Sequence, residues 1–216
     1  MTISLGYREP DSLEYTLSTL LSEVMEEKKL SLTQTIIQHD EGVDLIPANI
    51  ELSALEINLV NAMSREMMMR SLVEGIKSDY DYVIIDCMPS LGMLTINALA
   101  CSDSVLIPVQ AAYLPVKGLE QLIKTIGRVQ RRLNKKLTIE GILLTMVDSR
   151  TNFAKDISRL VVDTYSDQIK VFETLIPLSV RAAEISAEGS SIYQYDPKGK
   201  AALAYKNLTE EVVCHA

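Results

Sequence analysis

The sequence has no tryptophan, only two phenylalanines and only two histidines among its 216 residues. A core with so few large aromatic side chains must be built from Leu, Ile, Val, Met and Ala. His39 and His215 are the only imidazoles. Chemistry that requires a histidine base or a histidine-rich metal site is therefore not expected.

Cysteines are also few, and long apolar runs are absent. Cys87, Cys101 and Cys214 are widely spaced and form no CxxC pair, which argues against a disulfide framework and a zinc site. No apolar run approaches the roughly 20 residues of a membrane helix. The first residues lack the basic and apolar blocks of a signal peptide. We therefore expect a cytoplasmic protein without a membrane partner.

Positive charge is scarce in the first part of the chain. Residues 1–80 carry six Lys or Arg and fourteen Asp or Glu, whereas residues 81–216 carry fifteen of each. The net charge of −8 thus arises in the first part. Bulk charge does not indicate nucleic-acid binding, but the balanced second part allows a local basic patch.

Apolar patterning predicts an α/β fold in one domain, residues 1–216. Two short strand candidates, at residues 35–38 and 43–46, flank a turn-like segment. Apolar runs predict further strands at residues 82–85, 104–109, 139–147 and 170–176. Helical apolar spacing predicts helices at residues 12–28, 51–63, 65–77, 91–100, 119–133, 152–166, 180–188 and 199–213. Continuous apolar strands that alternate with amphipathic helices indicate a mostly parallel β-sheet with helices on both faces.

The residues that follow the predicted strands are the first candidates for a site, because ligands of such sheets bind beyond the carboxyl ends of the strands. Asp86 directly follows the strand predicted at 82–85. This is the arrangement of a Walker B carboxylate, which holds Mg²⁺ beside a nucleotide. An Asp in this position can equally be a turn residue or a helix cap.

The residues around Asp86 resemble one protein family. Residues 80–99, YDYVIIDCMPSLGMLTINAL, are similar to a segment of ParA and Soj proteins. The similarity extends to LIPANIEL (45–52), SDSVLIPVQ (102–110), GILLTMVDSRTN (141–152), IPLSVRAAE (176–184) and YDP (195–197). Because these segments cover nearly the whole chain in the same order, the chain resembles the ParA/Soj/MinD family of deviant Walker A partition ATPases.

The resemblance implies a P-loop NTPase-like fold of the SIMIBI class, with ATP or ADP and Mg²⁺ as ligands. It implies that Asp86 acts on Mg²⁺ through water. It places Met146 and Asp148 beside the adenine, and Pro177 to Val180 along the base pocket. From the residues alone, Met146 could instead fill the core and Asp148 could cap a helix.

The resemblance also implies contact with DNA. Arg150 and Arg181 occupy positions at which relatives carry arginines that touch DNA non-specifically; otherwise each is a solvated charge. A further segment is strongly basic, with Glu120 as its one acidic residue. Its basic residues are Lys117, Lys124, Arg128, Arg131, Arg132, Lys135 and Lys136. Its helical spacing indicates either a solvated outer face or a contribution to phosphate-backbone binding.

The family's phosphate-binding motif is not found in the sequence. KGGVGKT and DxDPQGN have no counterpart, and residues 1–7 resemble the family sequence just after the second motif. We therefore expect a domain that lacks its first βαβ unit, which would expose apolar strand edges. Without this loop and its lysines little remains to hold the phosphates, so we expect no useful ATP hydrolysis.

The resemblance leaves alternative functions. The first is a partition ATPase for DNA, plasmid or mobile-element segregation, which dimerises with ATP, binds non-specific DNA of the nucleoid and responds to a ParB-like centromere-binding protein. The alternative is a non-catalytic regulatory or remnant subunit that pairs with an intact relative. A third function, electron transfer of the nitrogenase iron-protein type, needs two cluster cysteines per chain, for which Cys87 and Cys101 are poorly placed.

Overall fold

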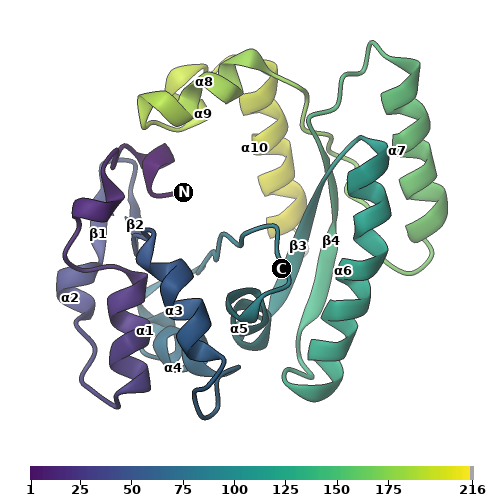
Figure 1. The fold of residues 1–216 in the computed structure, drawn as a ribbon. Coiled ribbons are helices and arrows are strands. Elements are labelled where there is room, and N and C mark those ends of the chain that lie inside the picture. The colour runs from purple at the N-terminus through teal and green to yellow at the C-terminus, as the bar shows by residue number, and fades with distance from the viewer. Residues whose placement is uncertain (215–216) are drawn as a thin grey trace. The chain divides into compact units, whose positions relative to one another are not determined.

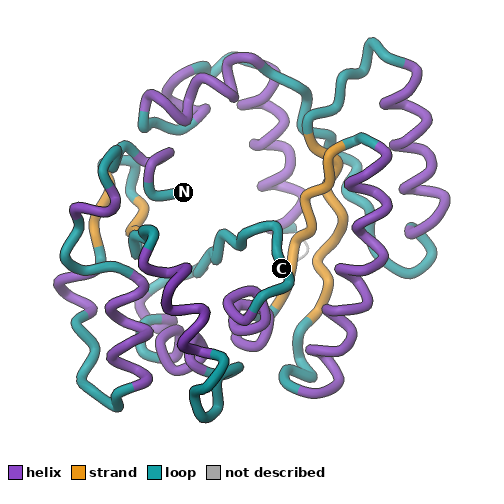
Figure 2. Tube along the Cα trace, viewed as in Figure 1, coloured by secondary structure: helices purple, strands orange, loops and turns teal. Residues whose placement is uncertain are grey.

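The computed structural model describes residues 1–214, and none of the helices in this part combines the length and apolar character needed to cross a membrane. The chain forms two compact units. The first comprises Met1–Ser102, Val129–Lys135 and Ser186–Gly189, and the second comprises Asp103–Arg128, Lys136–Ile185 and the residues from Ser190 onward. Figure 1 shows the elements by their labels and Figure 2 by their type.

The first unit is mostly helical. Its α-helices are α1 (Leu17–Met25), α2 (Leu32–Thr35), α3 (Glu51–Leu59), α4 (Met68–Glu74) and α5 (Met93–Cys101). Its two short strands, β1 (Ile37–His39) and β2 (Val43–Leu45), form an antiparallel hairpin in which Ile37 pairs with Leu45. The hairpin confirms both upstream strand candidates, and the observed ends of the strands differ from the predicted ends by at most two residues.

Leucine side chains from four helices build the core of the first unit. The buried cluster consists of Leu20, Leu21, Leu55, Leu59, Met69, Leu72, Leu94 and Ala98. Asn97 of α5 is buried beside it and has every polar group satisfied. Its Oδ1 accepts the Met69 N–H at 3.1 Å, and its Nδ2 donates to the carbonyls of Arg65 and Met93 at 2.7 and 3.0 Å. These bonds fix α5 against the start of α4.

The prediction of a strand at residues 82–85 is wrong. In the described part of the chain this segment joins no β-ladder, and Figure 2 draws the stretch between the short 3-10 helix Lys77–Asp79 and α5 as loop. Tyr82 and Ile84 expose 60% and 81% of their surface. An all-apolar strand is stable in a sheet only when neighbours pair its backbone and helices cover both faces. The first unit supplies neither for residues 82–85.

The second unit contains the parallel sheet. Strands β3 (Ser104–Gln110) and β4 (Thr138–Thr145) pair in parallel, with Gln110 opposite Thr145. The predicted strand at 170–176 is irregular: Val171 and Pro177 form isolated parallel bridges to Ile142 and Val147. The helices are α6 (Tyr113–Arg132), which begins in this unit, α7 (Asn152–Tyr165), α8 (Val180–Glu188), α9 (Ile192–Tyr195) and α10 (Lys200–Val213).

Helices lie on both faces of this sheet, as the sequence predicts. Figure 1 shows α6 and α7 on one side of β3 and β4, and α10 on the other. Leu143, Phe172 and Ile176 form a buried cluster against which Leu208 of α10 packs. Leu143 and Leu144 of β4 point to opposite faces of the sheet and are 3% and 1% exposed, so β4 is buried on both faces.

Glu211 joins α10 to residues 170–174. Its Oε1 accepts the N–H of Glu173 at 3.0 Å, and its Oε2 accepts the N–H of Thr174 at 3.2 Å. The Lys170 Nζ lies 3.8 Å from Oε1. Burial raises the pKa of Glu211, but the hydrogen bonds from Glu173 and Thr174 and the charge of Lys170 outweigh it, so this pKa lies below its ordinary value.

We predict that Glu211→Gln lowers the free energy of unfolding by about 1–2 kcal/mol near neutral pH, because the amide can accept only one of the two N–H groups well. The pKa of Glu211 is lower in the folded state than in the unfolded state. Its contribution to the free energy of unfolding is therefore complete above the unfolded-state pKa of about 4.3 and decreases as the pH falls below it. Urea unfolding of both proteins at about pH 7 and about pH 4 measures this. An equal difference at both pH values would contradict it.

Candidate functional site

The carboxyl end of β4 meets residues 176–178 at one edge of the second unit's sheet. Val147 bridges Pro177 in parallel. The Val147 N–H donates to the Ile176 carbonyl at 3.0 Å, and the Leu178 N–H donates to the Val147 carbonyl at 3.1 Å. This pairing brings two separate predicted site segments, residues 146–150 and 177–181, to the same edge.

Met146 is the residue at which the chain leaves β4. Its φ is +52°, in the left-handed region that costs a non-glycine residue about 1 kcal/mol. Its side chain is 52% exposed, which rules out the alternative that Met146 fills the core. Strained backbone of this kind tends to occur at functional sites.

Asp148 shapes the turn that follows. Its carbonyl accepts the Thr151 N–H at 3.0 Å, and its Oδ1 accepts the Arg150 N–H at 3.2 Å. Thr151, and not Asp148, caps α7 by accepting the N–H of Ala154 at 3.2 Å. Hydrogen bonds from the Arg150 side chain and backbone hold the pKa of Asp148 below its ordinary value. Asp148 is therefore an anionic group at the sheet edge.

The remaining predicted residues of the second unit are accessible. Pro177 is half-buried, whereas Val180, the first residue of α8, is 75% exposed. Arg150 exposes 84% of its side chain. Arg181 is also exposed, and its guanidinium lies 5.8 Å from the ring centroid of Tyr195. Both arginines can thus reach a large ligand.

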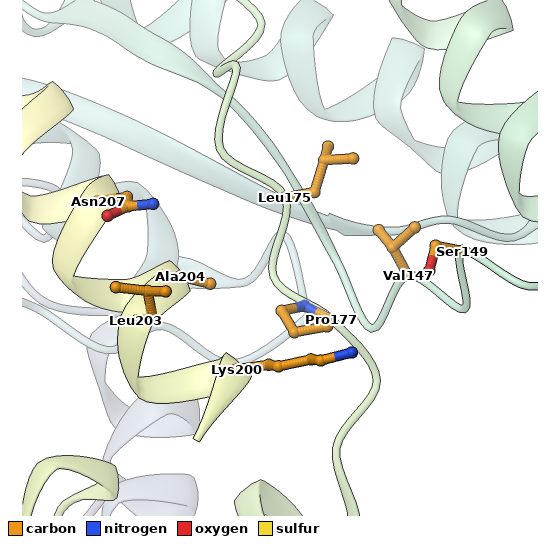
Figure 3. A pocket seen from close by; sticks show the side chains of 8 residues that line it. All are labelled: Val147, Ser149, Leu175, Pro177, Lys200, Leu203, Ala204 and Asn207. Atoms are coloured by element: carbon orange, nitrogen blue, oxygen red, sulfur yellow. The ribbon is translucent and has the colours of Figure 1, made fainter. Parts of the chain in front are cut away.

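A cavity of about 300 Å³ opens beside this edge (Figure 3). It is lined by Val147, Ser149, Leu175, Pro177, Lys200, Leu203, Ala204 and Asn207. Figure 3 shows the Lys200 side chain extending past Pro177. A mostly apolar wall with a few polar groups suits a planar organic ligand, and the volume is at the lower end for small-molecule sites.

Of the predicted site residues, Pro177 lines this cavity, whereas Met146, Asp148 and Val180 do not. Sequence reasoning missed Lys200 and Asn207. No motif marks them, and only the packing of α10 brings them to the edge. The helical periodicity of residues 199–213 predicted that helix but not which of its side chains meet the strand ends.

Asp86 belongs to the first unit and lies on the exposed segment before α5. Its side chain is 56% exposed, and its Oδ2 lies 3.4 Å from the amino nitrogen of Met1. Among the described residues, no three His, Cys, Asp or Glu side chains gather into a metal-binding group. A single accessible carboxylate suits Mg²⁺, because this ion keeps several waters and takes its other ligands from phosphates. It does not suit a metal whose ligands all come from the protein.

Comparison with known proteins agrees with this geometry. A family model for an AAA domain matches residues 1–139. The sporulation initiation inhibitor protein Soj of Bacillus subtilis is 47% identical over 175 residues, which are 81% of this chain and 68% of that protein. The chromosome partitioning protein ParA of Myxococcus xanthus is 44% identical over 171 residues, which are 79% of this chain and 60% of that protein.

A solved structure extends the likeness to the fold. The cobyrinic acid a,c-diamide synthase of Mycobacterium smegmatis, with bound ADP and magnesium, matches with a TM-score of 0.81 at 32% identity and covers 99% of this chain and 77% of that one. The parallel sheet, its flanking helices and these matches define an α/β protein of the AAA-domain class. Within that class, the chain belongs to the Soj/ParA family of chromosome-partitioning proteins. It spans 60% to 68% of the length of these two relatives.

We predict that Met146→Gly unfolds with a free energy about 1 kcal/mol higher than Met146→Ala. Both changes remove the half-exposed side chain, but only glycine adopts a positive φ without steric cost. Thermal and urea unfolding of the two variants provide the measurement. If alanine proved as stable as glycine, the backbone strain at the end of β4 would be disproved.

Proposed function

We propose that the chain acts in DNA segregation as a partition-ATPase subunit, with residues 1–216 forming one nucleotide-binding domain. The observation that supports this proposal is the pairing of Val147 with Pro177, which brings residues 146–150 and 177–181 to one edge of the sheet. In this proposal Met146 and Asp148 contact the adenine, and Pro177 and Val180 line the base pocket.

Asp86 is proposed to hold Mg²⁺ through water. The ion, when bound, neutralises charge on the phosphates of ATP or ADP. This role fits an exposed carboxylate that is not part of a larger acidic cluster among the described residues. Within residues 1–216 no GxxxxGK[ST] loop surrounds the phosphates, so the contacts proposed for these residues are those to the base and, through Asp86, to the metal.

We predict that a fluorescent ATP analogue binds and is displaced by ATP but not by CTP. Val180→Glu should weaken binding about tenfold, because a carboxylate at the pocket repels the nucleotide phosphates. Val162→Glu, on an exposed position of α7, is the matched control.

Phosphate release should stay at background in the wild type and in Asp86→Ala. Mg²⁺-dependent turnover that Asp86→Ala abolishes, or equal loss of binding in both glutamate variants, would contradict this account.

Non-specific DNA is the second proposed ligand, through Arg150, Arg181 and the basic face of α6. Leu119, Ile126 and Val129 of this helix are at most 4% exposed. The basic residues of α6, by contrast, are exposed: Lys117, Lys124, Arg128, Arg131 and Arg132. Glu120 pairs with Lys124 at 2.5 Å. Such a row can follow a phosphate backbone without reading bases.

Neutralising Lys124, Arg128 and Arg131 with glutamine should reduce the salt dependence of DNA binding. Each lost phosphate contact lowers the slope of log K against log salt by about 0.9, so the triple variant should lose roughly two to three. Fluorescence anisotropy with a labelled duplex at several salt concentrations measures the slope. The control replaces Lys28, Lys29 and Lys77, exposed lysines of the first unit, with glutamine. A slope unchanged relative to wild type would count against α6 as a DNA surface.

The partners proposed for such a subunit are a second copy or an intact relative, a ParB-like centromere-binding protein and the DNA of the nucleoid. A non-catalytic subunit that pairs with an intact relative is the second candidate function. The exposed apolar side chains of Tyr82 and Ile84 favour it, because a partner chain could cover them. Sedimentation of the chain alone and with an intact relative distinguishes the two: a mixed dimer that forms without nucleotide supports the second.

A further inference from the structure

Arg150 and Asp148 form an ion pair within the turn that connects β4 to α7. The Arg150 Nε lies 2.8 Å from Asp148 Oδ1, and its Nη2 lies 2.9 Å from Oδ2. The backbone N–H of Arg150 donates to the same Oδ1 at 3.2 Å. Asp148 thus binds both the backbone and the side chain of the residue proposed to contact DNA.

The turn holds the two groups in this arrangement. Val147, just before Asp148, is fixed by its hydrogen bonds with Ile176 and Leu178, and Thr151, just after Arg150, is fixed as the cap of α7. The two side chains therefore meet with little loss of backbone freedom. The Asp148 side chain is 26% exposed and that of Arg150 is 84% exposed, so a phosphate that uses the Nε and Nη2 edge of the guanidinium must compete with the carboxylate.

Asp148 and a DNA phosphate can each bind the Nε and Nη2 edge of the Arg150 guanidinium. Arginine binds carboxylates and phosphates alike through a planar fork of two N–H groups. When Asp148 occupies Nε and Nη2, that edge cannot bind a phosphate oxygen in the same way. Arg181 is placed differently, because its guanidinium lies over the Tyr195 ring, 5.8 Å from the centroid.

We propose that Asp148 acts as a latch on Arg150, and that this contact keeps the affinity of the chain for non-specific DNA below the value that a released Arg150 gives. The inference rests on the proposed DNA-binding function and adds a restraint to it. Exposed ion pairs are weak, so releasing the arginine should strengthen DNA binding by about two- to fivefold. The effect should depend on Arg150.

Asp148→Asn is the variant that opens the latch. Asparagine keeps an oxygen that can accept the Arg150 backbone N–H, so the turn is preserved, but it lacks the charge that holds the guanidinium. Removing any negative charge strengthens DNA binding slightly. Asp156→Asn, on an exposed position of α7, makes the same charge change and is the matched control.

The experiment compares the binding of a labelled duplex of mixed sequence at low salt. It uses the full chain, Asp148→Asn, Asp156→Asn, Arg150→Gln and the double variant Asp148→Asn/Arg150→Gln. We expect Asp148→Asn to bind about two- to fivefold more tightly than Asp156→Asn. Arg150→Gln should bind more weakly than wild type, and the double variant should exceed Arg150→Gln only by the small gain that Asp156→Asn shows over wild type. In parallel, water exchange of the Arg150 Nε–H by NMR should be faster in Asp148→Asn than in wild type.

The outcomes separate the latch from the function on which it rests. If Arg150→Gln weakens binding but Asp148→Asn equals Asp156→Asn, the latch is disproved and the DNA-binding proposal survives. If Arg150→Gln binds like wild type, or wild type does not bind at all, the role of Arg150 in DNA binding fails and the latch fails with it. If the double variant gained more over Arg150→Gln than Asp156→Asn gains over wild type, the latch would also be overturned, because that gain could not act through Arg150.

Discussion

The parallel hydrogen bonds between β4 and residues 170–178 determine where the candidate residues of the second unit lie. The Phe172 N–H bonds the Ile142 carbonyl, and the Ile176 N–H bonds the Leu144 carbonyl, each at 3.0 Å. The burial of Leu143 and Leu144, which point to opposite faces, stabilises this pairing from both sides of the sheet. Because the register is fixed, Val147, two residues beyond the end of β4, pairs with Pro177. The proposed adenine edge depends on this register.

Most elements of the second unit could be predicted because their apolar patterns are strong. The observed bounds of β3, α7, α8 and α10 differ from the predicted ranges by at most one residue at each end. The strand at 170–176 is irregular for a local reason: the N–H groups of Glu173 and Thr174 bond Glu211 rather than β4. Periodicity could not reveal that competition. Residues 82–85 have the composition of a buried strand, but burial also requires neighbours that the described part of the first unit does not supply.

The candidate site was predicted in part. The resemblance to ParA and Soj proteins indicated Met146, Asp148 and Pro177, and the structure brings their segments to one edge. The positive φ of Met146 and the ion pair of Asp148 with Arg150 could not be predicted, because both depend on the turn geometry after β4. Lys200 could not be predicted either, since helix packing places it at the cavity.

The strained end of β4, the anionic turn at Asp148 and the cavity beside Pro177 lie at one edge of the second unit's sheet. Family membership and this edge support the same proposal, adenine-nucleotide binding in DNA segregation. Photoaffinity labelling with 8-azido-ATP, followed by peptide mapping, tests it most directly. The account predicts that label appears in residues 146–150 or 176–180 and disappears when excess ATP is present. Label confined to other parts of the chain, or label that excess ATP does not displace, would contradict it.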